Sequence, residues 1–124
     1  MKLTELQQTY RKNIVEHLRL LSSSQEQLEY QRQVPIADVS AELFCMWGDD
    51  YYNEELRDDA EFRCAFSSSE LAAMEKFNQV FDDVLASLPD SHLPWIDDFI
   101  LTPEWKKLSN AAAIALLAFK AKSG

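Results

Sequence analysis

Apolar residues recur at helical spacing along most of this chain. Over residues 3–21 an apolar side chain stands every three or four positions, and the same spacing returns over residues 71–88. That period places apolar side chains on one face of an α-helix. Pro89 cannot continue a helix. The pattern therefore predicts two amphipathic helices, over 3–21 and 68–88, of which the second is the longest in the chain.

Polar residues at two places have the spacing that begins a helix. Ser23 and Glu26, and again Ser67 and Glu70, are three positions apart. In such a capping box the serine and the carboxylate satisfy each other's backbone N–H groups. The first pair predicts a second helix, which ends before Pro35 because the residue preceding a proline disfavours helical geometry.

Three shorter segments complete the pattern. Apolar residues crowd over 41–47, which predicts a short, largely buried helix with Gly48 as its left-handed C-terminal cap. The polar residues of 49–59 predict an exposed loop with one helical turn. Residues 95–101 suit a short helix, and a threonine followed by a proline then starts a last helix over 103–121.

These elements predict an all-α fold, a compact single-domain bundle of about five to six helices over residues 1–124. The apolar fraction of 47% supplies one hydrophobic core for a chain of this length. Gly48 and Gly124 are the only glycines. Their scarcity argues against tight β-hairpins, phosphate-binding loops and dinucleotide-binding fingerprints, which require glycine.

Neither a leader nor a membrane segment is expected from the sequence. The first residues lack the apolar run of a signal peptide, and no stretch approaches the ~20 apolar residues of a membrane span. We therefore expect a cytoplasmic protein with no membrane partner. Cys45 and Cys64 lie in apolar helical surroundings and are expected to be buried, reduced thiols. A disulfide between them stays open for an oxidising compartment.

The net charge of −9 is unevenly distributed. Residues 1–33 hold five basic and four acidic side chains, and residues 105–124 hold four lysines and no acidic side chain. Residues 34–104 hold seventeen acidic side chains against three basic ones. This anionic middle disfavours direct binding to nucleic-acid phosphates.

The sequence lacks the residue spacing of a metal site built on its histidines. A di-metal helical bundle uses a Glu three positions before a His, but Ile14 precedes His17 and Pro89 precedes His92 at that spacing. Glu16 and His17 are neighbours that point in different directions, so both are expected on a solvated helix face. No metal or other cofactor is predicted.

The paired carboxylates at 82–83 and 97–98 do not form an acid–base pair either. Adjacent residues on a helix diverge by about 100°. The serines stand in capping runs and the chain has no nucleophile elbow. We expect no catalytic residues and no enzyme activity.

The acidic segment after Trp47 is the strongest candidate for a functional surface. Carboxylates at such density repel one another, so they persist most easily where they are solvated or where a partner binds them. One interpretation is a plain solubility surface. The other is a recognition patch whose carboxylates pair with Lys or Arg while the tyrosines act as rigid anchors. Its candidate partner-binding residues are Asp49, Asp50, Tyr51, Tyr52, Glu54, Glu55, Asp58 and Asp59. A second candidate surface consists of Asp82, Asp83, Asp97 and Asp98.

A series of short patterns runs through residues 44–120. They are the acidic Asp-Tyr-Tyr segment, Glu61-Phe62, Phe66-Ser67-x-x-Glu70, Phe77-Asn78-x-x-Phe81, Leu88-Pro89 and Thr102-Pro103-Glu104-Trp105 before an alanine-rich helix. This series resembles small bacterial immunity proteins, including ones encoded beside contact-dependent growth-inhibition toxins. The resemblance implies a cytoplasmic inhibitor that binds a cognate toxin domain tightly. Many such toxins are nucleases with basic clefts, which suits an acidic inhibitor.

Two other functions remain open at this point. One is a helical regulatory or scaffolding protein that self-associates through an apolar helix face, with the acidic residues serving only solubility. The weaker one is a small hydrolase or metal-dependent enzyme. A neighbouring gene for a toxin-bearing secreted protein would favour the inhibitor.

Overall fold

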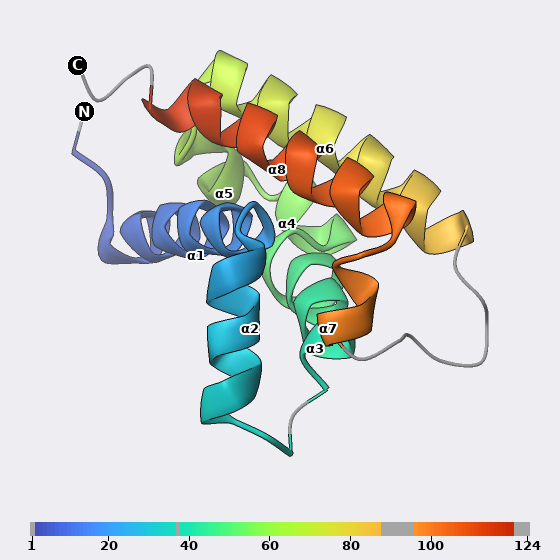
Figure 1. The fold of residues 1–124 in the computed structure, drawn as a ribbon. Helices are drawn as coiled ribbons and strands as arrows, with labels where there is room; N and C mark the ends of the chain where they lie inside the picture. The colour runs from blue at the N-terminus through green and yellow to red at the C-terminus, as the bar shows by residue number, and fades with distance from the viewer. Residues whose placement is uncertain (1, 37, 88–95, 121–124) are drawn as a thin grey trace.

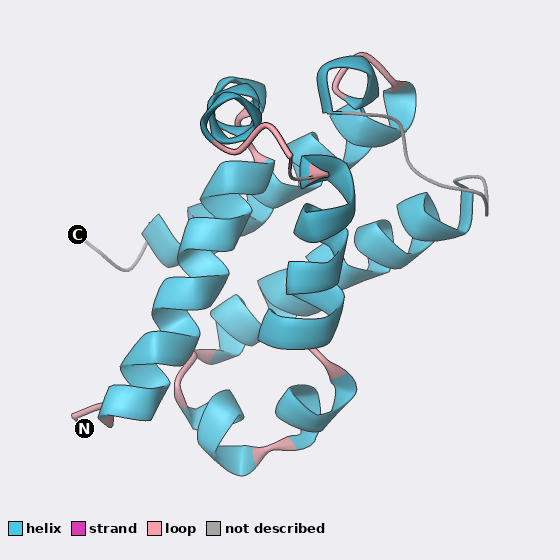
Figure 2. Ribbon diagram, turned by 90° about the horizontal axis from the view of Figure 1, so that it is seen from below, coloured by secondary structure: helices cyan, strands magenta, loops and turns pink. Residues whose placement is uncertain are grey.

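Helices follow one another along the chain in the computed structural model, which describes residues 2–36, 38–87 and 96–120. The elements are α1 (Glu5–Leu21), α2 (Ser24–Gln33), α3 (Val39–Cys45), the π-helix η1 (Met46–Tyr51), α4 (Glu54–Asp58), α5 (Ala60–Cys64), α6 (Ser68–Ser87), α7 (Ile96–Phe99) and α8 (Pro103–Lys120). Within the described ranges there is no strand (Figure 2), which confirms the all-α prediction. None of the helices described is both long and apolar enough to cross a membrane.

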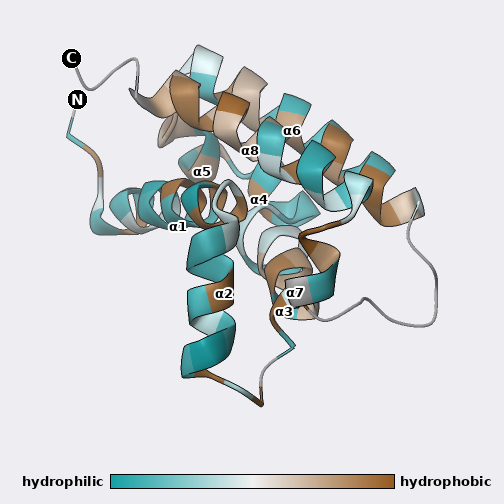
Figure 3. Ribbon diagram, in the orientation of Figure 1, coloured by the Kyte–Doolittle hydropathy of each residue, from teal (hydrophilic) through white to brown (hydrophobic). Residues whose placement is uncertain are grey.

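The two longest helices form an antiparallel pair. Figure 1 shows α6 and α8 side by side, with α1 packed across α8 and α2 leading away toward α3 and α7. Hydrophobic and hydrophilic turns alternate along α6 and α8 (Figure 3), as expected of helices that bury one face. The buried apolar side chains of these elements share one core.

Capping residues set the helix starts. Thr4 and Gln7 form a reciprocal capping box at α1. Ser67 and Glu70 form the predicted box at α6, with Ser67 N donating to Glu70 Oε1 at 2.8 Å and Glu70 N to Ser67 Oγ at 3.2 Å. At α2 only half of the predicted box exists. Ser23 Oγ accepts from Glu26 N, but the Ser23 N–H donates to Leu20 O instead.

The predictions for residues 45–64 require three corrections. Gly48 does not end a helix, because its φ is not positive and the chain continues from α3 directly into η1. The segment 49–59, expected to be a loop with one helical turn, contains that turn as α4 but begins within η1, so it is more helical than predicted. Cys45 and Cys64 are free but exposed rather than buried. Each lies at the C-terminal end of a short helix, where local apolar neighbours do not enclose it.

The predicted ends of the last elements partly lie outside the described residues. The predicted helix end at Leu88 and Pro89, the start of the short helix at Trp95 and the last position of the final helix, Ala121, are among the residues that the structure does not describe. The start of α8 is as predicted, because Thr102 Oγ1 accepts from Trp105 N at 3.1 Å and Pro103 is the first helical residue.

Candidate partner-binding surface

The acidic segment is built on a buried anchor. Trp47, in η1, is fully buried, and its ring packs against those of Tyr52 and Phe77 at centroid distances of 5.0 and 4.7 Å. Its indole Nε1 donates to Asn78 Oδ1 on α6 at 3.0 Å. The π-helix thereby attaches the start of the acidic segment to the core.

Tyr52, predicted to be an exposed aromatic anchor, belongs instead to the buried side of this segment. It is 6% exposed, and its hydroxyl donates to Glu75 Oε2 at 3.0 Å. Burial, followed by the hydrogen bond to Glu75 and the negative charge there, raises the pKa of Tyr52 to about 12. Because of this raised pKa the phenol stays neutral at physiological pH.

Helix α4 is held against α6 by the same carboxylate. Arg57 pairs with Glu75 at 3.1 Å, and its guanidinium lies 5.2 Å from the centroid of the Tyr52 ring. Asn53 starts the helix by accepting the Leu56 N–H at 2.8 Å, and its amide donates to Asp49 O at 2.9 Å. These contacts give the predicted loop a defined backbone.

The six predicted carboxylates all lie on the exposed side of this scaffold. None of them forms an ion pair with another residue in the described part of the chain. Glu54 and Glu55 occupy the first turn of α4, where the helix dipole favours negative charge, and Asp59 caps α5 through the Glu61 N–H at 3.0 Å. The exposed set is Asp49, Asp50, Glu54, Glu55, Asp58 and Asp59. We call it the acidic surface.

Tyr51 is the aromatic residue of the pair that reaches this surface. It is half-buried and borders a hollow of about 140 Å³ together with Glu16 and Met46. Burial, and then the charges of Asp50 and Glu16, raise the pKa of its phenol. Sequence reasoning did not include Glu16, because α1 approaches η1 only in the folded chain and no local pattern signals that contact.

His17 lines the same hollow from within, which corrects its expected place on a solvated helix face. It is 3% exposed, its Nε2 lies 3.0 Å from Leu43 O, and its ring meets Tyr51 edge-on at 5.3 Å. Because the acceptor is a carbonyl, Nε2 carries the proton in the neutral ring. Burial lowers the pKa of His17 to about 4, although the bond to Leu43 opposes that shift. Glu16, its neighbour, is exposed as predicted.

This histidine makes stability depend on pH. The pKa of His17 is about 4 in the folded chain, whereas an unperturbed histidine, as in the unfolded chain, has a pKa of 6.5. Between these two pH values the unfolded chain therefore binds a proton that the folded chain does not. Stability is therefore expected to fall as the pH drops from about 6.5 to about 4, by roughly 3 kcal/mol in total. Urea unfolding of the wild type and of His17→Gln across that range is the measurement. A wild-type slope that His17→Gln leaves unchanged contradicts the assignment.

The second candidate surface draws on two helices, α6 and α7. Asp82 and Asp83 are exposed on α6 but point to different sides. Asp82 lies 3.5 Å from Asn78 Nδ2, whereas Asp83 borders the seam between α6 and α8 beside Lys107. Asp98 is exposed on α7, and the side chain of Asp97 is outside the described set.

No group of three or more His, Cys, Asp or Glu side chains in the described ranges has an arrangement that would hold a metal ion. Comparison of the chain with protein-family models, curated proteins and solved structures found no match.

Proposed function

We propose that this chain is an inhibitory binding protein that docks its acidic surface on a basic protein toxin domain and thereby blocks that domain's active site. The observation that carries the proposal is the set of six exposed carboxylates, none in an ion pair with a described residue, on short helices anchored by Trp47 and Glu75. In this proposal the chain has no catalytic step of its own and acts in the cytoplasm.

The electrostatics of the acidic surface favour a cationic partner. Arg57 is the only basic residue within 49–59, and Glu75 already pairs with it. Lysine and arginine side chains of a partner would therefore supply the missing counter-charges. Such a surface attracts a basic protein over about 8 Å at physiological salt and raises its association rate.

The rigidity of the segment adds to this argument. Since Asn53, Arg57 and Tyr52 already fix the backbone, little conformational entropy is lost when a partner binds. Tyr51 and the hollow beside it provide an aromatic edge flanked by Asp50 and Glu16. The resemblance to immunity proteins agrees with a toxin as the partner, and a nuclease with a phosphate-binding cleft has the required positive charge.

Neutral isosteres test the proposal. We expect Asp49→Asn/Asp50→Asn and Glu54→Gln/Glu55→Gln each to slow association with a cognate basic toxin domain, by roughly tenfold at low salt. The effect should shrink at high salt, because salt screens exposed charges. Stopped-flow or surface-based kinetics at two salt concentrations measure both.

A control with the same loss of charge separates local from overall electrostatics. Asp82→Asn/Asp98→Asn removes two carboxylates of the second candidate surface and is expected to change the association rate less than twofold. An association rate that changes neither with salt nor with the substitutions at 49–55 would contradict the proposal. A larger effect from the control would place the interface on the second surface.

A further inference from the structure

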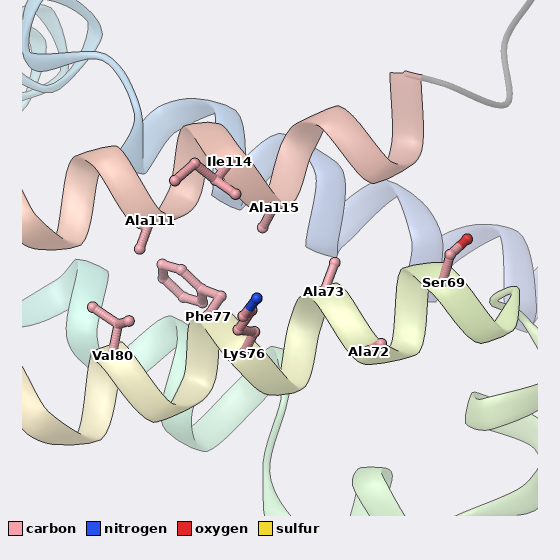
Figure 4. Close-up of a pocket in the computed structure, with 9 residues that line it drawn as sticks. All are labelled: Ser69, Ala72, Ala73, Lys76, Phe77, Val80, Ala111, Ile114 and Ala115. Atoms are coloured by element: carbon pink, nitrogen blue, oxygen red, sulfur yellow. The ribbon is translucent and has the colours of Figure 1, made fainter.

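The seam between α6 and α8 is hollowed along its outer side. Along the N-terminal half of α6, small side chains leave a groove of about 450 Å³, bordered by Ala72 and Ala73 of α6 and by Ala111 and Ala115 of α8 (Figure 4). Ile114, at the same groove, is 57% exposed. A second hollow, of about 240 Å³, continues the seam at its other end. The seam therefore presents an elongated, partly apolar face that no described element covers.

Two opposite charges stand on this face of α6. Lys76 borders the groove and Asp83 borders the second hollow. They are seven residues apart, which on a helix is about two turns and about 10 Å along the axis. Both are exposed, and neither has an ion-pair partner among the described residues. Glu104 and Lys107 also border the second hollow, so together with Asp83 its lining carries a net charge of −1.

This spacing is self-complementary. A two-fold axis brings the same patch of both subunits together. If one residue contacts a second residue of the partner subunit, that second residue therefore contacts the first one of the partner subunit. An axis that crosses α6 between Gln79 and Val80 places Lys76 opposite the partner subunit's Asp83, and Asp83 opposite the partner subunit's Lys76. One axis thus pairs both charges.

We propose that two copies of this chain associate face to face through the α6–α8 seam, with the two α6 helices antiparallel about that axis. The result is a four-helix arrangement of the kind that helical bundles adopt. It involves a different face of α6 from the one that Glu75 offers to α4, so the acidic surface stays free in each copy. The proposal does not depend on the inhibitor function.

The size of the face is sufficient. A helix of 20 residues such as α6 is about 30 Å long, and two packed helices about 10 Å apart are roughly 20 Å wide. The two copies together would then bury roughly 1,200 Å², at the lower edge of the range for stable interfaces. A second copy is favoured over an unrelated helix because its charges match this face in both directions.

Charge reversal in the full-length chain tests the dimer and its register. Each of Lys76→Asp and Asp83→Lys turns two attractive contacts into two repulsive ones, so each is expected to weaken dimerisation roughly tenfold or more. The double variant Lys76→Asp/Asp83→Lys restores opposite charges and is expected to recover it. Asp82→Lys, an equal charge change on another face of α6, is the matched control and should leave the dimer intact. Sedimentation velocity over a concentration series gives the dissociation constants, and circular dichroism verifies that each variant is folded.

Several results would overturn this arrangement. A wild-type chain that sediments as a monomer at its highest soluble concentration excludes the dimer. A dimer that tolerates both single reversals, or that Asp82→Lys weakens equally, uses another face. Failure of the double variant to recover association rejects the proposed register. None of these outcomes bears on binding through the acidic surface, since the toxin kinetics measure that separately.

Discussion

Replacing Arg11 by alanine is expected to lower the free energy of unfolding by about 3 kcal/mol or more, because it leaves a buried carboxylate without its counter-charge. Glu70 is 1% exposed, and Arg11 holds it through two bonds, Nη1–Oε1 at 2.7 Å and Nη2–Oε2 at 2.9 Å. The same guanidinium donates to Ala65 O at 2.9 Å and lies over the rings of Phe66 and Phe119. One side chain thus joins α1 to the starts and ends of three other segments.

The pair also determines how acid acts on this region. Burial by itself raises the pKa of Glu70, but hydrogen bonds from Arg11 and Ser67 and the charge of Arg11 hold the pKa below its ordinary value. A carboxyl with a depressed pKa contributes its stabilisation at neutral pH and loses it as the pH falls through that lowered pKa. Arg11→Ala should therefore also reduce the loss of stability in strong acid.

A surface ion pair provides the control for this prediction. Arg32 and Glu29 form an i, i+3 pair whose side chains are 74% and 47% exposed. Such a pair contributes ~0–1 kcal/mol, so Arg32→Ala should change stability by less than about 1 kcal/mol. Urea unfolding of the two variants beside the wild type is the measurement. Equal effects of Arg11→Ala and Arg32→Ala would show that the buried pair is not a stabilising contact.

Replacing Trp47 by alanine is expected to lower the free energy of unfolding by about 4 kcal/mol, a large part of the ~5–15 kcal/mol that is typical of a domain. The indole is fully buried among the rings of Tyr52, Phe77 and Phe81, so the substitution leaves a large cavity. It also removes the donor to Asn78 Oδ1. Since Trp47 attaches η1 to α6, the acidic surface should lose its fixed backbone together with stability.

Two variants calibrate that result. Ile36→Ala deletes an apolar side chain that is 94% exposed and should change stability by less than about 0.5 kcal/mol. Trp47→Phe keeps an aromatic ring and should fall between the two. Thermal and urea unfolding give the ranking, and hydrogen exchange at residues 48–58 reports on the acidic segment. If Trp47→Ala unfolds no more easily than Ile36→Ala, the packing described for η1 is wrong.

Much of the helical structure was readable from local sequence. The period of apolar residues predicted α1 and α6, the Thr-Pro start and alanine-rich stretch predicted α8, and Ser67 and Thr102 marked two of the starts. These signals work because a helix is stabilised by contacts between residues three or four positions apart. The position of the acidic carboxylates on the surface also followed, since a dense row of like charges is stable only in water or against a partner.

Local signals were misleading where a residue's environment comes from distant segments. His17 and Tyr52 have polar groups, yet both are buried. Each is satisfied by a hydrogen bond to an acceptor on another helix, Leu43 O for His17 and Glu75 for Tyr52. Cys45 and Cys64 have apolar neighbours along the chain, yet no distant segment among the described residues covers them. Burial of a single polar or small residue is therefore a property of packing rather than of local pattern.

The sequence by itself determined that this chain is helical, where the long helices lie, and that residues 49–59 carry an exposed negative charge. Only the tertiary structure decided which side chains surround that charge. It brought Glu16 beside Tyr51, attached α4 to α6 through Arg57 and Glu75, and paired Arg11 with Glu70, 59 positions away. Contacts of that separation leave no periodic trace in a single sequence, because they depend on how whole helices pack and not on the spacing within one.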